Sequence, residues 1–474
     1  MKSWFFAVVV AVLHAISLWK HLELAANDLH TDVCVLGGGS GGIGAALAAS
    51  RYGASVVLVE RMGRLGGTST NAYVCNWEPG PGDAFAREMY DRLQQMNAVT
   101  IVSDHNPDRS KGRFGLWLPT AGARYEDTLR RWGRPRTDWR AIVFDPNALA
   151  RVALELLEET GKCRVLLNTT YQEAHAEGNR VLSIKARPDD GTEYDIHAKV
   201  FIDCTGGVHL CRDIGCETML GPEPASKFNE PSAPEQPDKT LNAISLCYRI
   251  RESENPKQAI EPNPPVETWP RSAHVSGLPN GDRIVNTLAL LPGWTVFDMG
   301  YEKAMDEAKR RAQAHWRWLQ GHDAFSGYEF DSFAPTLGIR ESHRVVGEYV
   351  LTQHDLLAGL PKQTHRDVIA VADHAMDVHG EGGRRVHGEL KAPYGIPYRC
   401  LIPMGWTNLL AACRGASFSH IAASSCRLSR TIIALGHAAG LAAATAAKEG
   451  ITVGAVDVRT LQRELGMPLA AWEQ

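Results

Sequence analysis

The stretch from residue 32 to residue 60 constrains the fold more than any other part of the chain. A short apolar run at residues 33–36 suits a buried parallel strand, and the pattern Gly37-x-Gly39-x-x-Gly42 follows it directly and opens a helix of small residues. In this pattern the first glycine permits a tight turn, the second lets the backbone approach a pyrophosphate, and the third lets the helix pack closely on the strand. The pattern predicts a unit that binds a dinucleotide phosphate at the helix N-terminus.

The residues after this helix complete the unit. A second apolar run at residues 55–59 predicts the next strand, and Glu60 stands at its end, where a carboxylate can accept hydrogen bonds from a ribose 2'-hydroxyl. The glycine pattern alone is a weak signal in a chain with 44 glycines. Strand, glycines, helix, second strand and acid nevertheless occur in order, which favours a nucleotide site over a glycine-rich turn between two buried elements.

The segment after the acid indicates which dinucleotide is bound. It reads Arg61-Met-Gly-Arg-Leu-Gly66-Gly67-Thr68, and an acid followed by a Gly-Gly-Thr loop resembles the FAD-dependent oxidoreductases with a glutathione-reductase-like flavin fold. This resemblance implies FAD as the cofactor. It also implies that Glu60 lies at the adenosine ribose and that the Gly-Gly-Thr loop lies against the ribityl chain and the pyrophosphate.

Four motifs in the last third of the chain extend the resemblance. They lie at residues 337–349, 394–399, 408–414 and 435–440. As a set they are similar to one family of FAD-dependent oxidoreductases, distantly similar to the succinate dehydrogenase and fumarate reductase flavoproteins, over about residues 31–450. The chain departs from the family pattern at two places: His343 stands where a second arginine is expected, and Cys413 stands where a glycine often precedes Arg414.

The resemblance also implies the set of cofactor-binding residues. In the related flavoproteins a buried strand, here residues 200–204, returns to the main sheet, and the Thr-Gly pair at its end lies against the FAD. The expected cofactor-binding residues are Gly37, Gly39, Ser40, Gly41, Gly42, Glu60, Arg61, Gly66, Gly67, Thr68, Thr205, Gly206 and Gly436.

Length and patterning predict two folded parts in an α/β protein. We expect a Rossmann-like FAD-binding domain with a β-meander, formed by residues 29–207 and 331–450, an inserted α+β substrate domain at residues 208–330, and a C-terminal tail at residues 451–474. The meander strands are predicted at residues 165–171, 180–185 and 194–196, separated by turn residues. No second glycine pattern follows a strand, so we expect no separate NAD(P) domain.

The N-terminus predicts export. Met1-Lys2 precedes an apolar run at residues 4–19, and polar residues follow, so residues 1–28 are expected to be a signal peptide of a secreted or periplasmic protein. The alternatives are an uncleaved membrane anchor and a cytosolic protein whose start is overextended. Only the anchor would make a membrane a partner.

Charge and cysteine spacing exclude two other classes of ligand. The formal charge of -4 gives no general attraction to nucleic acid. The ten cysteines form no Cys-x-x-Cys pair and no zinc spacing, so we expect no metal site.

Candidate catalytic residues come from both ends of the chain. The loop at residues 71–83 leaves the flavin motif and is expected to border the substrate, while His420 and Arg427 precede a helix that begins near Ser429 and is expected to end at the flavin. We expect His420 to act as acid or base and Arg427 to stabilise charge. For Arg340, a structural salt bridge and a clamp for a substrate carboxylate remain alternatives.

These features together predict an FAD-dependent oxidoreductase. It would act on a small polar organic substrate by hydride transfer to or from flavin N5, with an electron acceptor that the sequence does not name. One alternative is a monooxygenase or halogenase that uses reduced flavin and oxygen. The other is a flavin-binding protein without turnover, because a resemblance predicts the cofactor better than the chemistry.

Overall fold

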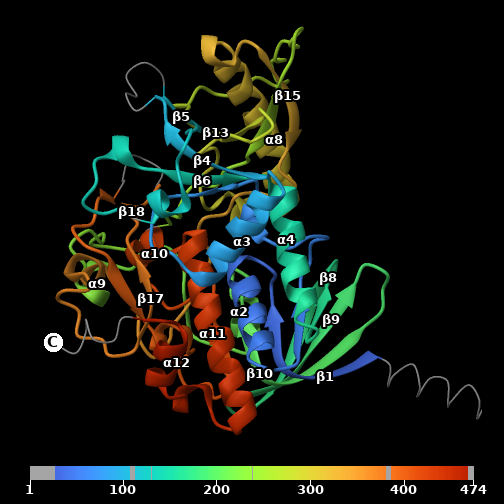
Figure 1. Ribbon diagram of the computed structural model, residues 1–474, viewed down its shortest axis with the longest axis vertical. Coiled ribbons are helices and arrows are strands. Elements are labelled where there is room, and N and C mark those ends of the chain that lie inside the picture. The colour runs from blue at the N-terminus through green and yellow to red at the C-terminus, as the bar shows by residue number, and fades with distance from the viewer. Residues whose placement is uncertain (1–26, 107–112, 130, 238, 380–385, 468–474) are drawn as a thin grey trace, which may run out of the picture.

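The structure is a computed structural model that describes residues 27–106, 113–129, 131–237, 239–379 and 386–467. The expected signal peptide or anchor at residues 1–28 falls almost entirely outside the described residues. Two sheets lie along the long axis of the molecule, and helices pack on both (Figure 1). This α/β architecture confirms the expected fold class.

The first sheet has a parallel core in the order β7-β2-β1-β10-β21. Its strands are β1 (Asp28–Leu36), β2 (Val56–Val59), β7 (Cys163–Leu166), β10 (Tyr194–Asp203) and β21 (Leu409–Ala411). The apolar run after residue 32 forms the fully buried end of β1, and β2 is buried along its whole length. Because parallel strands covered on both faces are apolar throughout, these short runs could be assigned from the sequence.

The meander differs from its prediction at two places. The strand expected at residues 165–171 is broken into β7 and β8 (Thr169–Glu177), because Asn168 adopts a left-handed conformation with φ of 50° and turns the chain. The strands expected at residues 194–196 and 200–204 are one long strand, β10. Its first half pairs antiparallel with β9 (Arg180–Pro188), and its last three residues pair parallel with β21.

The helices α2 (Ser40–Arg51) and α11 (Ser429–Glu449) lie side by side at the centre of the molecule (Figure 1). Small residues set their separation: a Cβ atom at Gly436 would overlap the carbonyl oxygen of Gly41, and one at Gly440 would overlap that of Ala45. Among the described helices, α11 is the one long and apolar enough to span a membrane, but most of it is buried inside the protein. It is therefore a core helix.

The second sheet has the order β15-β12-β14-β13-β5-β4-β6-β3 and is covered by the long helix α8 (Tyr301–Gln320). Its strands are β3 (Asn76–Trp77), β4 (Val99–Asp104), β5 (Phe114–Pro119), β6 (Ala141–Phe144), β12 (Tyr248–Glu252), β13 (Ala273–Gly277), β14 (Arg283–Asn286) and β15 (Tyr328–Phe333). Half of these strands come from residues 76–144, inside the range 29–207 assigned from the sequence to the FAD-binding domain. The sheet thus joins that range to residues 248–333 through the parallel pair β5 and β13.

Helix α4 (Pro146–Glu159) connects β6 of the second sheet to β7 of the first. Helix α4 begins at Pro146, because the Asp145 side chain accepts hydrogen bonds from the backbone N–H groups of Asn147 and Ala148. Further helices and strands are α3 (Ala84–Gln95), β16 (Arg344–Val345), α9 (Gln353–Ala358), β17 (Val368–Ala372), β18 (Met376–Asp377), β20 (Tyr394–Pro397) and α10 (His420–Cys426).

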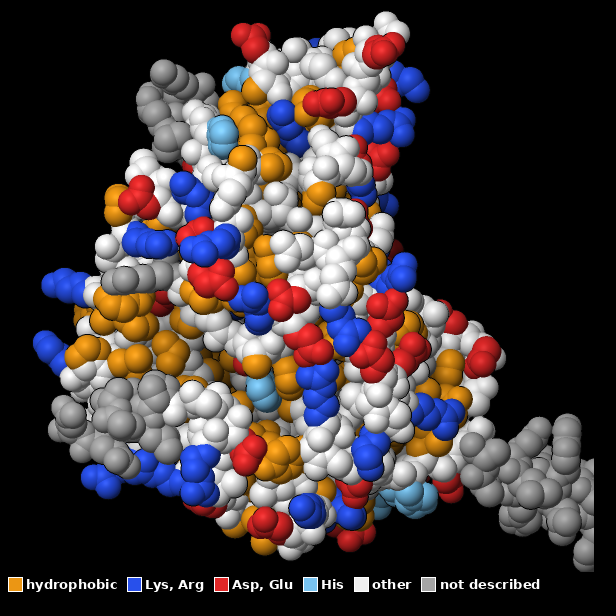
Figure 2. Space-filling view, viewed as in Figure 1, with side chains coloured by type: hydrophobic (Ala, Val, Ile, Leu, Met, Phe, Trp, Pro, Cys, Tyr) orange, Lys and Arg blue, Asp and Glu red, His pale blue; other side chains and the backbone are white. Residues whose placement is uncertain are grey.

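Acidic and basic side chains are interspersed on the face of the molecule shown in Figure 2. That face carries no broad patch of a single sign. Several arginines line a cavity between the two sheets: Arg61, Arg212, Arg340, Arg414 and Arg427.

The contact between α2 and α11 makes a prediction about stability. In an ordinary helix, alanine is favoured over glycine by about 1 kcal/mol. Gly440→Ala should instead lower the unfolding free energy by about 1–3 kcal/mol, because the added methyl group overlaps the Ala45 carbonyl.

Gly454→Ala is the matched control, because a Cβ there meets only the Glu348 side chain, at 3.5 Å. Thermal unfolding of both variants measures the effect. A Gly440→Ala protein at least as stable as the parent would show that the two helices can separate at no cost.

Candidate functional site

A cavity of about 630 Å³ opens at the carboxyl ends of the parallel strands of the first sheet. Gly37 follows β1, Glu60 follows β2, and residues 204–207 follow β10, and all of them lie on its wall. Strands and loops of the second sheet close the opposite side. Ligands of open α/β sheets bind at this end of the strands.

The glycines of the first motif fall into two groups. Gly37 has a φ of 92°, and a Cβ there would lie 2.6 Å from the carbonyl oxygen of Cys204, while a Cβ at Gly42 would overlap the carbonyl oxygen of Gly37. Close packing of the protein backbone therefore requires glycine at both positions. At Gly39 the nearest atom to an added Cβ is the Cα of Gly67, 3.9 Å away. Nothing in the described protein fills this space, so its shape fits a ligand that approaches the backbone.

The Glu60 carboxylate is held in place by the backbone. It accepts hydrogen bonds from the N–H groups of Gly38 (2.7 Å) and Met62 (2.8 Å) and is almost fully buried. Burial raises the pKa of Glu60 despite these two bonds. The carboxylate therefore orders the turn after β1 as well as forming part of the cavity wall.

The other expected cofactor residues lie mostly on the same wall. Ser40, Gly41, Arg61, Gly67, Thr68, Thr205 and Gly206 line the cavity. Gly42, Gly66 and Gly436 do not. Gly66 donates its N–H to the Gly38 carbonyl (2.8 Å), and Gly436 packs against α2. These last residues shape the site from behind its wall.

Arg414 is a wall residue to which the sequence assigned no role. Its guanidinium lies against Gly206, and its buried Nε has no hydrogen-bond partner among the described residues. Burial and the neighbouring Arg61 and Arg427 lower the pKa of Arg414. Neither Arg414 nor Arg61 has a carboxylate partner in the part of the chain that the structure describes. The pair fits the negative charge of a diphosphate.

A histidine and two arginines meet in another part of the cavity wall. His379 Nε2 lies 2.6 Å from Asp377 Oδ2, and Arg427 Nη2 lies 3.3 Å from the same oxygen. Burial and the repulsion of Arg340 and Arg427 lower the pKa of His379 to about 4, although Asp377 opposes this shift. His379 is therefore neutral at pH 7.

The loop at residues 71–83 reaches this wall, as expected, and adds an acid. Glu78 Oε2 lies 3.2 Å from His374 Nε2 and 2.7 Å from Arg131 Nη1. Burial alone would raise the pKa of Glu78, but His374 and Arg131 hold it well below its usual range. His374 Nδ1 lies 2.7 Å from the Ala375 carbonyl oxygen. Both ring nitrogens of His374 therefore face acceptor oxygens, and these contacts fix the orientation of the ring beside Glu78.

Glu78, His374, Asp377 and His379 were not predicted as site residues from the sequence. A signal for three of them was present in the run Asp373-His-Ala-Met-Asp-Val-His379, where acids and histidines crowd a short segment. The segment includes β18, whose placement beside the cavity depends on contacts with α10 that the run itself does not specify.

Arg340 lies on the cavity wall without a carboxylate partner among the described residues. Its Nη1 donates to the carbonyl oxygens of Ala243 (2.7 Å) and Leu288 (3.3 Å). Desolvation and the repulsion of Arg427 lower its pKa to about 10. The alternatives for Arg340 were a structural salt bridge and a clamp for a substrate carboxylate. No salt bridge of Arg340 occurs among the described residues, and Arg340 lines the cavity.

His420 does not lie where the sequence analysis expected it. It begins α10, is buried, and places Nδ1 2.7 Å from Glu341 Oε1, outside the wall of the large cavity. The reason is the direction of α10, which turns its first residues away from α11 and toward residues 223–240. Arg427, at the other end of α10, lines the large cavity, and its role in stabilising charge stays a prediction.

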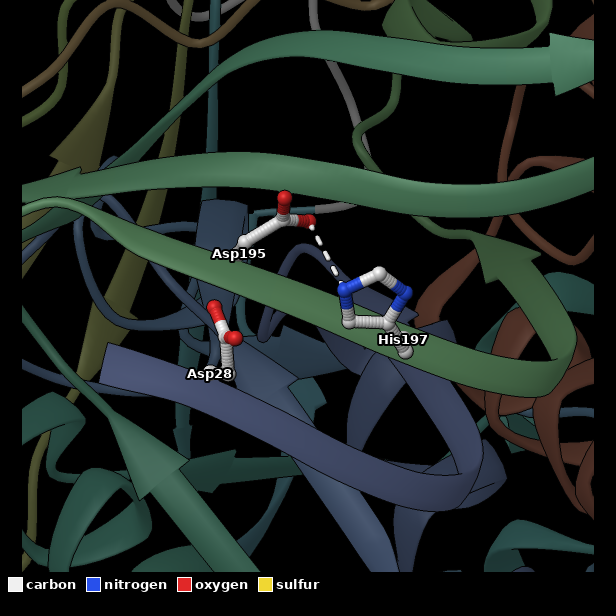
Figure 3. Close-up of side chains that lie close together, drawn as sticks. All are labelled: Asp28, Asp195 and His197. Carbon is white, nitrogen blue, oxygen red and sulfur yellow. Dashed lines mark ion pairs between the residues drawn. The ribbon is translucent and has the colours of Figure 1, made fainter. Parts of the chain in front are cut away.

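One group of side chains could hold a metal ion, although no metal site was expected. Asp28 on β1 lies beside Asp195 and His197 on β10, with an ion pair of 3.5 Å between the last two (Figure 3). The group is partly exposed and lies at the end of β1 opposite Gly37. Exposed acids of this kind are common without an ion and do not define a metal centre.

The fold and the cavity are typical of flavin-dependent enzymes. The structure combines a dinucleotide-binding βαβ unit with a meander, and a second sheet closes a cavity lined by arginines. A family model described as FAD dependent oxidoreductase matches residues 32–465. The chain belongs to this family, and its cofactor is FAD.

The individual proteins that resemble this chain either have low sequence identity over most of its length or match only a short segment. Glutathione reductase of Schizosaccharomyces pombe is 54% identical over 44 residues, which are 9% of this chain and 9% of that protein. A geranylgeranyl bacteriochlorophyll reductase-like protein of Thermoplasma acidophilum has 13% identity and a TM-score of 0.47, covering 94% of this chain and 92% of that one. A p-nitrophenol 4-monooxygenase of Pseudomonas putida has 12% identity and a TM-score of 0.44, covering 93% of this chain and 84% of that one.

The two kinds of glycine predict two kinds of defect. Gly39→Ala should leave the stability of the apoprotein unchanged but reduce FAD binding at least about tenfold, because the methyl group enters space that the pyrophosphate needs. Gly42→Ala should lower the stability of the apoprotein itself. FAD absorbance after purification and thermal unfolding of the apoprotein measure the two effects. If Gly39→Ala binds FAD with normal affinity, the pyrophosphate does not occupy the space beside Gly39.

Proposed function

We propose that this oxidoreductase oxidises a small polar organic molecule that carries a negatively charged group, such as a carboxylate. The observation that carries the proposal is Arg340, a guanidinium on the cavity wall whose described partners are two carbonyl oxygens. Asp377 is the acid paired with the neighbouring Arg427, so the arginines exceed the acids there. An anionic substrate would balance this charge.

Bound FAD supplies a hydride acceptor or donor at N5 of the flavin ring. The residues of the chain then have to position the substrate and accept its proton. Arg340 would bind the anionic group of the substrate. His379, neutral at pH 7 and oriented by Asp377, would accept the proton that leaves a hydroxyl or amino group as hydride leaves the adjacent carbon.

Arg340 variants test the charge of the substrate. Anaerobic reduction of bound FAD should be faster with small 2-hydroxy acids or amino acids than with the matched neutral alcohols or amines. Arg340→Gln should weaken binding of the acid by roughly 10- to 100-fold, as expected for the loss of a charge-assisted hydrogen bond, and should change the neutral compounds little.

Arg340→Lys is the matched control, because it keeps the charge and loses the planar donor group. Its affinity for the acid should lie between those of the parent and of Arg340→Gln. Equal reduction by acids and neutral analogues in the parent protein would contradict an anionic substrate.

Arg427 variants test whether this residue acts on the flavin. A cation near the flavin favours the anionic reduced form, so Arg427→Gln should lower the two-electron reduction potential, by about 30 mV for each 1.4 kcal/mol of lost interaction. Dye-coupled reduction measures the potential without a known substrate. A potential equal to that of the parent, with FAD still bound, would limit Arg427 to its contacts with Asp377.

The two alternative functions give different results in the same anaerobic experiment. A monooxygenase or halogenase would be reduced by an external reductant such as NAD(P)H rather than by its organic substrate, and would consume that substrate only when oxygen is added. A flavin-binding protein without turnover would be reduced by neither at a useful rate.

A further inference from the structure

A second, smaller cavity of about 390 Å³ lies behind the wall of the large one. Its apolar wall consists of proline, alanine, valine and isoleucine side chains, and its polar wall consists mainly of glutamates and His420. The residues that matter here are Glu223, Glu230, Glu235, Val378, His420 and Ile421.

A single layer of chain separates the two cavities. Asp377 and His379 line the large cavity, whereas Val378 between them lines the small one. The neighbouring segment alternates in the same way: Arg340 faces the large cavity, and Glu341 turns to the other side, where it meets His420. The small cavity is therefore a separate site and not an extension of the cofactor site.

Buried charges surround the polar side of the small cavity. Arg344 lies 2.5 Å from both Glu223 and Glu341, and His420 Nδ1 lies 2.7 Å from Glu341. Glu230 adds a third carboxylate, bonded to Ser419 and to the backbone of Gln353. Three buried carboxyl groups thus face one buried guanidinium and one imidazole, so acidic groups outnumber basic groups here.

Two polar atoms of these buried side chains lack partners among the described residues. Glu230 uses Oε1 for both of its hydrogen bonds, with distances of 2.5 Å and 2.6 Å, and no described residue donates a hydrogen bond to Oε2. His420 uses Nδ1, and no described residue bonds to Nε2. The two residues are 4% and 5% exposed and both line the cavity. Burial raises the pKa of Glu230, which shows the cost of leaving its charge without a cation.

We propose that the small cavity binds a small organic ammonium compound. Its charged nitrogen would donate to Glu230 Oε2 and offset the excess of acidic groups, its carbon body would pack on the apolar wall, and His420 Nε2 would bond to a polar substituent. A metal ion fits less well. Among the described residues these glutamates and His420 do not converge closely enough to form a ligand group for one.

Three compounds with one ring and different head groups test the class of ligand. Calorimetric titration of the FAD-loaded protein should detect binding of cyclohexylammonium, weaker binding of cyclohexanol, and none of cyclohexanecarboxylate. Absence of cyclohexylammonium binding at millimolar concentration, or equal affinity for the alcohol, would overturn the proposal.

A pair of glutamine variants tests the location. Glu230→Gln keeps a carbonyl oxygen that can accept both existing hydrogen bonds and replaces only the unpartnered Oε2 by an amide NH₂ group, which repels a cation. It should weaken cyclohexylammonium binding at least about tenfold. Glu235→Gln removes the same charge from an exposed side chain at the cavity rim and should change the affinity by less than about threefold.

FAD content and thermal unfolding verify that both variants are folded. Unchanged affinity in a folded Glu230→Gln protein would place the cation elsewhere and overturn the assignment. This outcome would leave the proposed oxidoreductase function untouched, because the large cavity and its arginines are not altered.

Discussion

The structure depends on backbone-to-backbone contact between segments that are far apart in the sequence. The loop after β1 touches the end of β10, and α2 touches α11, in each case at a glycine where a side chain would overlap a carbonyl oxygen. The first contact holds the carboxyl ends of β1 and β10 together, and the second sets the separation of α2 and α11, whose first residues line the cofactor wall. Small residues therefore matter here more for the shape of the cavity than for flexibility.

Local patterns in the sequence predicted the parts of the fold that local physics decides. The apolar strands β1 and β2 and the glycine turn between β1 and α2 were placed within a few residues, and the FAD family was confirmed. The continuous strand β10 was missed, because its two halves pair with different neighbours. His420 was placed at the wrong cavity because proximity along the chain to Arg427 does not determine which way each end of a short helix faces.

Charge is distributed unevenly across the thin layer between the cavities. Arginines 340, 414 and 427 face the cofactor side, whereas Glu223, Glu230 and Glu341 lie around the other side. Glu223 and Glu341 are paired with Arg344 on their own side, whereas Arg340 and Arg414 have no carboxylate partner among the described residues. The alternation of neighbouring residues such as Arg340 and Glu341 places opposite charges on opposite sides of the layer. A single extended segment can thus contribute to two environments of opposite sign, because successive side chains point to opposite faces.

The parallel strand β21 and the helix α11 have a consequence for biosynthesis. They carry or flank Arg414, Ser429 and Ile432, which complete the cofactor wall, yet the ribosome makes them after both sheets are otherwise finished. A nascent chain that lacks them has the glycine turn but an open cavity and an uncovered α2. The complete FAD site therefore forms only after α11 has left the exit tunnel, so the earlier part of the chain has to persist without its cofactor while α11 is made.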